Sequence, residues 1–312
     1  MIINKEENFL SAVIYVHNSE LTISNFIKNI NEVLKQNFEK YEIICVNDAS
    51  EDDSVNKIKN TFENLGDSVL SIVNMSFYQG LEASMNAGVD LAIGDFILEF
   101  DNDYMDYSTQ TIMDVYFHSL KGFDIVAASN SRKLFTSSVF YKLYNRSSST
   151  QYKITTDTFR ILSRRAINRI HAMSRTIPYR KALYSNCGLK VDIINYQPEV
   201  INKITHTKKQ IKSRQDTAFN TFILFTNIAY KISLSLTTLM MMATLGGLIY
   251  TIIIYALGQP VAGYTTMMLV ITGSFFGVFA ILAIIIKYLS ILVDLIFVKQ
   301  KYTIESIEKI SK

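Results

Sequence analysis

The feature that most constrains this chain is the long segment 232–286, which contains no charged side chain. The segment is broken at 258–263 by the sequence Gly-Gln-Pro-Val-Ala-Gly, which is typical of a turn. A helix needs about 20 apolar residues to cross about 30 Å of hydrocarbon. Residues 232–257 and 264–286 each supply that length, so the sequence predicts two transmembrane helices in a membrane part at 231–287. The alternative is a buried helical hairpin in a water-soluble protein.

Lysines lie on both sides of this segment, with Lys231 before it and Lys287 the first charge after it. By the positive-inside rule, both ends are expected in the cytoplasm. The N-terminal sequence includes acidic side chains and lacks the apolar core of a signal peptide, which agrees with that orientation. Two spans are too few to enclose a channel for a growing polymer, so a processive synthase is disfavoured unless the chain oligomerises.

Basic residues are concentrated before the charge-free segment. No acidic residue occurs between Asp157 and Asp192, and a second basic cluster covers 203–214. Such clusters next to a span suit anionic lipid headgroups. We therefore expect 171–230 to be a membrane-interface segment and the lipid bilayer to be its partner, in preference to nucleic acid. An ordinary solvated basic face is the alternative.

The part of the chain before this interface segment alternates between strand and helix patterns. The sequence predicts strands at 11–16, 41–47, 69–73, 96–100 and 124–128, and helices at 21–36, 52–65, 81–91 and 111–120. Repeated strand–helix units predict an α/β domain with a mainly parallel sheet covered on both faces. Ligands of such sheets bind at the carboxyl ends of the strands.

Polar residues follow three of the predicted strands. They are the pairs His17-Asn18 and Asn47-Asp48 and the triplet Asp101-Asn102-Asp103. Carboxylates converging on one edge of a sheet suit a hard divalent cation, Mg²⁺ or Mn²⁺, together with phosphates. No Gly-rich phosphate loop is present, which disfavours an NTPase or a nicotinamide-dependent enzyme.

The whole pattern resembles the family-2 glycosyltransferases with the GT-A fold, a Rossmann-like nucleotide-sugar-binding domain. The similarity is strongest to the polyprenyl-phosphate branch, which includes dolichol-phosphate mannose synthases and bactoprenol glucosyltransferases. Five segments carry the resemblance, namely 11–18, 41–50, 79–88, 94–103 and 159–166. It implies a catalytic domain at 1–170, a cytoplasmic tail at 288–312, and a multi-pass protein of a bacterial inner (plasma) membrane.

The resemblance also implies an activity and a site. The expected enzyme is a metal-dependent, inverting hexosyltransferase that moves one sugar from a UDP-sugar to a polyprenyl (undecaprenyl) phosphate for surface glycan modification. Another lipid, giving a glycolipid, is the alternative acceptor. A homo-oligomer is compatible with it, and a non-catalytic membrane subunit that keeps the fold is the second alternative. The implied donor site consists of Asn18 and Glu20 at the base, Asp48 at the uridine or ribose, and Asp101 with Asp103 at the metal and diphosphate.

Three arginines, Arg160, Arg164 and Arg165, fall where relatives approach the acceptor phosphate, and Arg160 and Asp103 are expected to act in catalysis. Asp157 is a candidate base, although Thr158 holds the place that is acidic in several relatives. A polyprenyl phosphate is already ionised near neutral pH, so it needs positioning by cations more than it needs a base.

Overall fold

The computed structural model describes residues 5–63, 65, 69–131, 145, 152, 157–173, 179–199 and 302–310, together with isolated helical residues between 235 and 292. The chain divides into two compact units, Met1–Ala218 with Gln300–Lys312, and Phe219–Lys299. Among the described residues, none of the helices combines the length and the apolar character that a membrane span requires. Most residues of the two expected spans, 232–257 and 264–286, lie outside the described residues.

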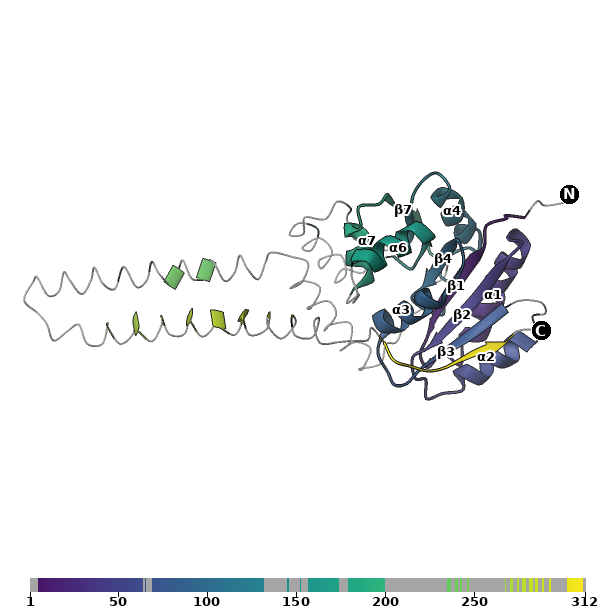
Figure 1. Ribbon diagram of the computed structural model, residues 1–312, viewed down its shortest axis with the longest axis horizontal. Coiled ribbons are helices and arrows are strands. Elements are labelled where there is room, and N and C mark those ends of the chain that lie inside the picture. The colour runs from purple at the N-terminus through teal and green to yellow at the C-terminus, as the bar shows by residue number, and fades with distance from the viewer. Residues whose placement is uncertain are drawn as a thin grey trace, which may run out of the picture. The chain divides into compact units, whose positions relative to one another are not determined.

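The first unit is built on one eight-stranded sheet with the strand order β7-β5-β6-β4-β1-β2-β3-β8 (Figure 1). Strands β4, β1, β2 and β3 are mutually parallel, β6 runs antiparallel to β4 and β5, and β8 runs antiparallel to β3. The strands are β1 (Leu10–Val16), β2 (Tyr41–Asn47), β3 (Val69–Met75), β4 (Phe96–Phe100), β5 (Ile125–Asn130), β6 (Phe159–Ser163), β7 (Val191–Tyr196) and β8 (Ile304–Ile310).

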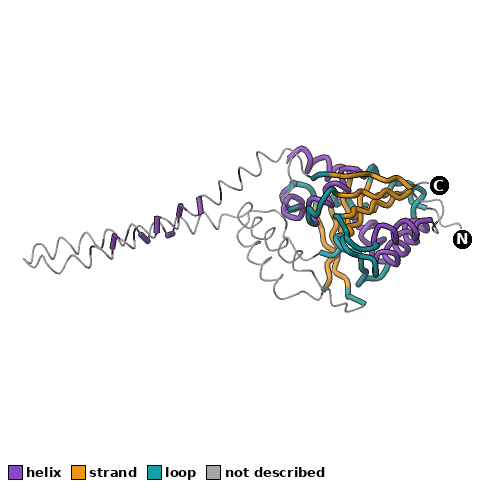
Figure 2. Tube along the Cα trace, turned by 90° about the horizontal axis from the view of Figure 1, so that it is seen from below, coloured by secondary structure: helices purple, strands orange, loops and turns teal. Residues whose placement is uncertain are grey.

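Helices cover both faces of this sheet (Figure 2). They are α1 (Ile23–Asn37), α2 (Ser54–Glu63), α3 (Leu81–Leu91), α4 (Gln110–Ser119), α6 (Arg164–Met173) and α7 (Arg180–Asn186). Side chains alternate between the faces along each strand. On one face Ala12 and Ile14 join the core formed with α1, α2 and α4. On the other, Val13 faces α3, whose Gly88 is so close to β1 and β2 that an added Cβ would lie 2.4 Å from Val13 Cγ1.

The fold confirms the mainly parallel α/β sheet and each of the strands and helices predicted within 11–128, with ends shifted by a few positions. The domain boundary at residue 170 is wrong. Helix α7 and strand β7 belong to the sheet unit, because β7 pairs with β5 in parallel register from Ile125↔Val191 to Asn130↔Tyr196. The described part of 171–230, residues 171–173 and 179–199, therefore belongs to the sheet unit.

The C-terminal tail also returns to the sheet. Strand β8 pairs antiparallel with β3, from Leu70↔Ile310 to Met75↔Ile304, and runs beside it at the edge of the sheet (Figure 1, yellow). The expectation of a separate tail at 288–312 is therefore wrong for residues 302–310, which belong to the unit that carries the candidate site.

Candidate functional site

The loops that follow β1 and β2 are tied to each other at the carboxyl edge of the sheet. Asn18 Oδ1 accepts the Glu51 N–H at 2.8 Å, and the Asn18 N–H donates to Ser50 Oγ at 3.1 Å. The Glu20 N–H donates to Asp52 Oδ2 at 3.0 Å. Asn18 and Glu20, both expected at the base of the donor, therefore lie together and shape this pair of loops.

Two residues of these loops have left-handed backbone conformations, Asn18 with φ 53° and Ala49 with φ 50°. Asparagine adopts this region readily, but alanine adopts it at a cost of about 1–2 kcal/mol. A strained residue persists only where its surroundings hold it in place, and such residues gather at ligand sites. The surroundings of the β2–α2 loop thus hold its backbone in a conformation that alanine would otherwise avoid.

Asp48 is fully buried, and its carboxylate is surrounded by donors of the protein. Oδ1 accepts the Gln79 N–H at 2.7 Å, and Oδ2 accepts the Gly80 N–H at 2.8 Å and the Tyr15 hydroxyl at 2.9 Å. Gly80 has φ 86° and ψ 166°, a conformation open essentially to glycine alone, which turns both N–H groups toward one carboxylate. In this structure Asp48 holds the start of α3 and offers no exposed oxygen to a nucleoside.

A hollow of about 440 Å³ opens beside Asp48, at the carboxyl ends of β2 and β3. Two aromatic side chains, Phe77 and Tyr78, belong to its lining. Phe77 is 59% exposed, and the ring of Tyr78 lies against that of His17 with centroids 4.7 Å apart. Its lining residues are Asn47, Ala49, Ser50, Glu51, Asn74, Met75, Ser76, Phe77, Tyr78 and Glu305. Aromatic rings with amide and carboxylate groups are a suitable lining for a flat polar ring.

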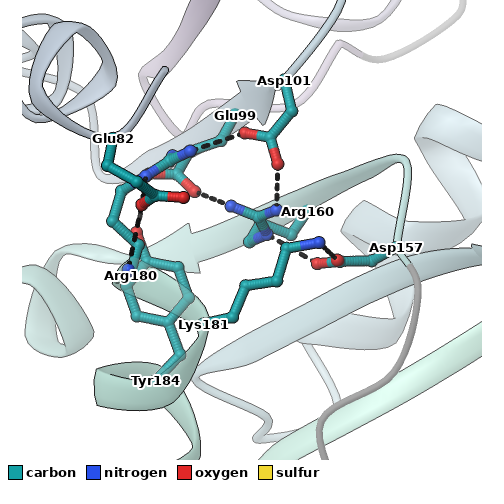
Figure 3. Close-up of polar contacts among 8 residues, drawn as sticks. All are labelled: Glu82, Glu99, Asp101, Asp157, Arg160, Arg180, Lys181 and Tyr184. Atoms are coloured by element: carbon teal, nitrogen blue, oxygen red, sulfur yellow. Dashed lines mark hydrogen bonds and ion pairs between the residues drawn. The ribbon is translucent and has the colours of Figure 1, made fainter. Parts of the chain in front are cut away.

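A buried ionic cluster lies at the carboxyl end of β4, on the face covered by α3 and α7 (Figure 3). Arg160, from β6, lies opposite Glu99 in the strand register and is 1% exposed. Its guanidinium donates to Glu99 at 2.6 Å, to Asp101 at 2.5 Å and to Asp157 at 2.8 Å. One arginine thus joins three carboxylates, two of them from β4 and its end.

A second buried arginine, Arg180 of α7, reaches the same carboxylates from the other side (Figure 3). It contacts Asp101 at 2.7 Å, Glu99 at 3.0 Å and Glu82 of α3 at 3.0 Å. The next residue, Lys181, pairs with Asp157. Both oxygens of the Asp101 carboxylate are therefore held by guanidinium groups.

The cluster shifts the acidities of its members. Burial raises the pKa of Asp101, but Arg160 and Arg180 outweigh it and hold this pKa well below its usual value. The pKa of Asp157 is lowered in the same way, since Arg160 and Lys181 outweigh the effect of burial. Burial lowers the pKa of Arg160, but the carboxylates around it outweigh burial and raise that pKa further. All three groups are therefore charged at neutral pH.

Asp103, the other end of the Asp-Asn-Asp triplet, is partly exposed and has a different environment. Its Oδ2 accepts the hydroxyl of Thr22 at the start of α1. No group of three side chains that could ligate a metal occurs among the described residues. Mg²⁺ is commonly held by one or two carboxylates with phosphates and water completing its shell. Asp103 fits that arrangement, whereas the oxygens of Asp101 already face two arginines.

The three arginines expected at the acceptor phosphate are not brought together. Strand β6 runs antiparallel to β4, so Arg160 lies at the carboxyl edge of the sheet and Arg164 about 13 Å away at the amino edge. There Arg164 donates to the carbonyl oxygens of Ala92 and Gly94 at 2.8 and 3.0 Å, just after α3. Arg165 is 75% exposed and lies 3.9 Å from Asp124.

The Tyr184 hydroxyl also belongs to the cluster, since it donates to Glu99 at 2.7 Å. Several residues of the site were not predicted from the sequence: Gln79, Glu82, Glu99, Arg180, Lys181 and Tyr184. One of them carries a readable signal. Glu99 stands two residues before Asp101 in an otherwise apolar strand, so both point to the same face, and a buried carboxylate there requires a cationic partner. Arg180 carries no such signal, because its partner Asp101 lies 79 residues away in the chain.

Residues 11–171 match the family described as Glycosyl transferase family 2. A prophage bactoprenol glucosyl transferase homolog of Escherichia coli (strain K12) is 31% identical over 196 residues, covering 60% of this chain and 62% of the relative. An uncharacterized glycosyltransferase of Synechocystis sp. is 29% identical over 197 residues, covering 61% of each chain. The match thus spans less than two thirds of the length of these relatives.

Solved structures with a similar fold are glycosyltransferases. A glucosyl-3-phosphoglycerate synthase from Mycobacterium tuberculosis, in complex with Mn²⁺, UDP and phosphoglyceric acid, superimposes with a TM-score of 0.52 at 15% identity, covering 69% of this chain and 78% of that one. A mannosyltransferase from Pyrobaculum calidifontis, in complex with GDP-Man and Mn²⁺, gives a TM-score of 0.51 at 14% identity, covering 70% and 63%. The sheet, the matched residues and these neighbours together show that the chain belongs to glycosyl transferase family 2 and has the GT-A fold.

Proposed function

We propose that this protein is a metal-dependent glycosyltransferase that moves one hexose from a UDP-sugar to a polyprenyl phosphate. The observation that carries the proposal is the site at the carboxyl end of β4, where partly exposed Asp103 adjoins the buried carboxylate–arginine cluster in a family-2 sheet. This edge is where an open α/β sheet binds its ligands.

The donor lies across the carboxyl ends of β3, β2, β1 and β4 in this proposal. Neighbouring strands are about 4.8 Å apart, so the hollow at β2 and β3 and Asp103 after β4 are separated by about 10–14 Å. A nucleoside diphosphate is long enough to bridge them. The base and ribose occupy the hollow, and the diphosphate points toward Asp103.

A bound Mg²⁺ or Mn²⁺ at Asp103 would neutralise charge on the diphosphate as it leaves the sugar. The residues of this chain supply the rest. Arg160 and Arg180 hold Asp101, two residues before Asp103, and so help to position the start of the loop after β4. Asp101 takes part as a fixed anion and is not proposed as a ligand of the metal.

The acceptor is proposed from its chemistry and from the relatives. Several relatives of this chain are called bactoprenol glucosyl transferases. A lipid phosphate is an ionised nucleophile, so it attacks without a strong base. This suits a site in which the cations around Asp157 lower its pKa and make it a weak base. Asp157 is therefore proposed to hold Lys181 and Arg160 in place, and the acceptor phosphate to approach from this side.

The setting of the reaction follows from the acceptor. We propose that residues 232–257 and 264–286 anchor the chain in a bacterial plasma membrane, with the sheet unit on the cytoplasmic side, where nucleotide sugars are made. The charge-free sequence of these segments supports this. Assembly into a homo-oligomer is compatible with it.

The test is sugar transfer by the full chain in detergent. The purified protein is offered a panel of labelled UDP-sugars with undecaprenyl phosphate and Mn²⁺, with a diacylglycerol acceptor in parallel. A chloroform-soluble, acid-labile product formed from one donor and abolished by EDTA is the expected result. Product formed with diacylglycerol alone would show that the acceptor is a neutral lipid and not a polyprenyl phosphate. If UDP binds but neither acceptor yields product, the acceptor is a different molecule, and absence of UDP binding as well would favour a non-catalytic subunit.

A further inference from the structure

We propose that the C-terminal strand β8 is part of the donor site, and that Gln79 is the positioning residue that connects it to Asp48. This inference rests on the proposed function. The tail meets the sheet at Thr303, which directly precedes β8 and lies against the loop between β3 and α3.

The contact between tail and loop is a clamp formed by one side chain. Gln79 Nε2 donates to the Thr303 carbonyl oxygen at 2.6 Å, and the Thr303 N–H donates back to Gln79 Oε1 at 2.8 Å. The Thr303 carbonyl also accepts the Ser76 N–H at 3.1 Å. The amide of Gln79 thus pairs with the backbone as a neighbouring strand would.

The backbone of the same residue holds the site. Its N–H donates to Asp48 Oδ1 at 2.7 Å, next to the Gly80 N–H on Oδ2 at 2.8 Å. Gln79 therefore connects the tail on one side with Asp48 on the other. A shift of its side chain would move the two N–H groups that satisfy a fully buried carboxylate.

The tail also reaches the hollow in which the nucleoside is proposed to lie. Glu305 belongs to its lining, together with residues of the β2–α2 and β3–α3 loops. Further along β8, Ser306 and Glu308 accept from the Asn74 amide, each at 3.1 Å, and Asn74 in turn accepts from Asn47 at 3.0 Å. Two linked amides at the ends of β2 and β3 are thus held in place by the tail.

A second attachment holds the tail at a distance from Gln79. The Tyr302 hydroxyl donates to Asp90 Oδ2 at 2.8 Å, near the end of α3, and His171 contacts the other oxygen of Asp90 at 2.7 Å. Because β8 is docked through several contacts, loss of the Gln79 amide leaves the strand paired with β3. The effect of a Gln79 variant then reports on the clamp itself.

The experiment measures binding of UDP with Mn²⁺ to the full chain by titration calorimetry, for the wild type, Gln79→Ala and Gln79→Glu. Gln79→Glu keeps the acceptor for the Thr303 N–H but places a carboxylate against the Thr303 carbonyl, so it tests the donor half of the clamp. Gln36→Ala is the matched control, since Gln36 is exposed on α1 and contacts only Glu32 among the described interactions. Thermal melts show that each variant is folded.

We expect Gln79→Ala and Gln79→Glu to raise the Kd of UDP by about 3- to 10-fold, and Gln36→Ala to leave it unchanged. In a transfer assay, the KM for the donor should rise by a similar factor while kcat is retained. An unchanged Kd in both Gln79 variants would refute the role of the clamp and leave the proposed function standing. Absence of UDP binding by the wild type would overturn the donor proposal and this inference together.

Discussion

The two halves of the carboxyl edge hold their carboxylates in different ways. Around β1–β3, the Asp48 carboxylate accepts from two backbone N–H groups and one hydroxyl, and no cation is among its described contacts. Around β4 and β6, Asp101 and its neighbours are buried against two arginines and a lysine. The first half is held by hydrogen bonds from uncharged groups, and the second by ion pairs between buried side chains. The two halves should therefore fail differently when they are changed.

The largest effect is expected from Arg160→Ala. This change leaves Glu99, Asp101 and Asp157 with one cation fewer in a buried setting, where breaking an ion pair costs about 3–5 kcal/mol. The free energy of unfolding, measured by denaturant-dependent hydrogen exchange at the amides of β4, should fall by that amount. The control Arg165→Ala removes an exposed side chain and should change it by less than about 0.5 kcal/mol. Equal effects of both changes would show that the ion pairs around β4 and β6 do not stabilise the protein.

A smaller loss is expected in the other half from Asp48→Asn. The amide can accept on one side only, so at least one of the N–H groups of Gln79 and Gly80 loses its partner. The expected cost is about 1–3 kcal/mol, confined to the start of α3. Faster hydrogen exchange at Gly80 with unchanged exchange in β6 would agree with this. Equal acceleration in β6 would mean that the two halves are not independent.

The pH dependence of stability separates the halves further. The pKa values of Asp101 and Asp157 are lower in the folded protein than in the unfolded chain, where they lie near about 3.9. Their stabilising contribution is therefore complete above about pH 5 and is lost as the pH falls below about 4. Asp157→Asn should flatten the fall in unfolding free energy between about pH 5 and pH 2. A slope equal to that of the wild type would contradict the stabilising role of the ion pairs between Asp157 and its cations.

The smallest effect is expected from Ala49→Gly. Glycine adopts φ 50° without the cost that alanine bears, so the change should stabilise the protein by up to about 1 kcal/mol despite the extra freedom of the unfolded chain. A rise in melting temperature of a few degrees or less is the expected readout. Clear destabilisation would indicate that the Ala49 methyl group makes a contact that matters more than its backbone.

The same division explains how much could be predicted from the sequence. The apolar periods of β1–β4 and α1–α4 and the polar pairs that follow the strands are local patterns, so the sheet and its carboxyl edge were predictable. Asp101, Asp103, Asn18 and Glu20 lie at that edge as expected. The position of Arg160 beside Asp101 follows from an antiparallel pairing over 59 residues, which no local pattern encodes.

The differences between the structure and the expectations from the sequence have the same origin. Arg164 and Arg165 follow Arg160 closely in the sequence, which suggests one group. Strand β6, however, runs from the carboxyl edge of the sheet, where Arg160 lies, to the amino edge, where Arg164 and Arg165 lie. The pairing of the tail at 302–310 could not be predicted, because its partner strand β3 lies near the other end of the chain. The charge of Asp48 makes it a candidate for donor binding, and the sequence does not show that backbone donors already surround it.

The proposed catalytic role of Asp103 is tested by sugar transfer with Asp103→Asn, compared with the wild type and with Asp114→Asn, a change of an exposed aspartate on α4. The assay uses the full chain with Mn²⁺, undecaprenyl phosphate and the preferred UDP-sugar. We expect Asp103→Asn to fold normally and to lose at least about 100-fold in kcat, while Asp114→Asn keeps wild-type activity. Wild-type transfer by Asp103→Asn would contradict the claim that this edge of β4 is the catalytic centre.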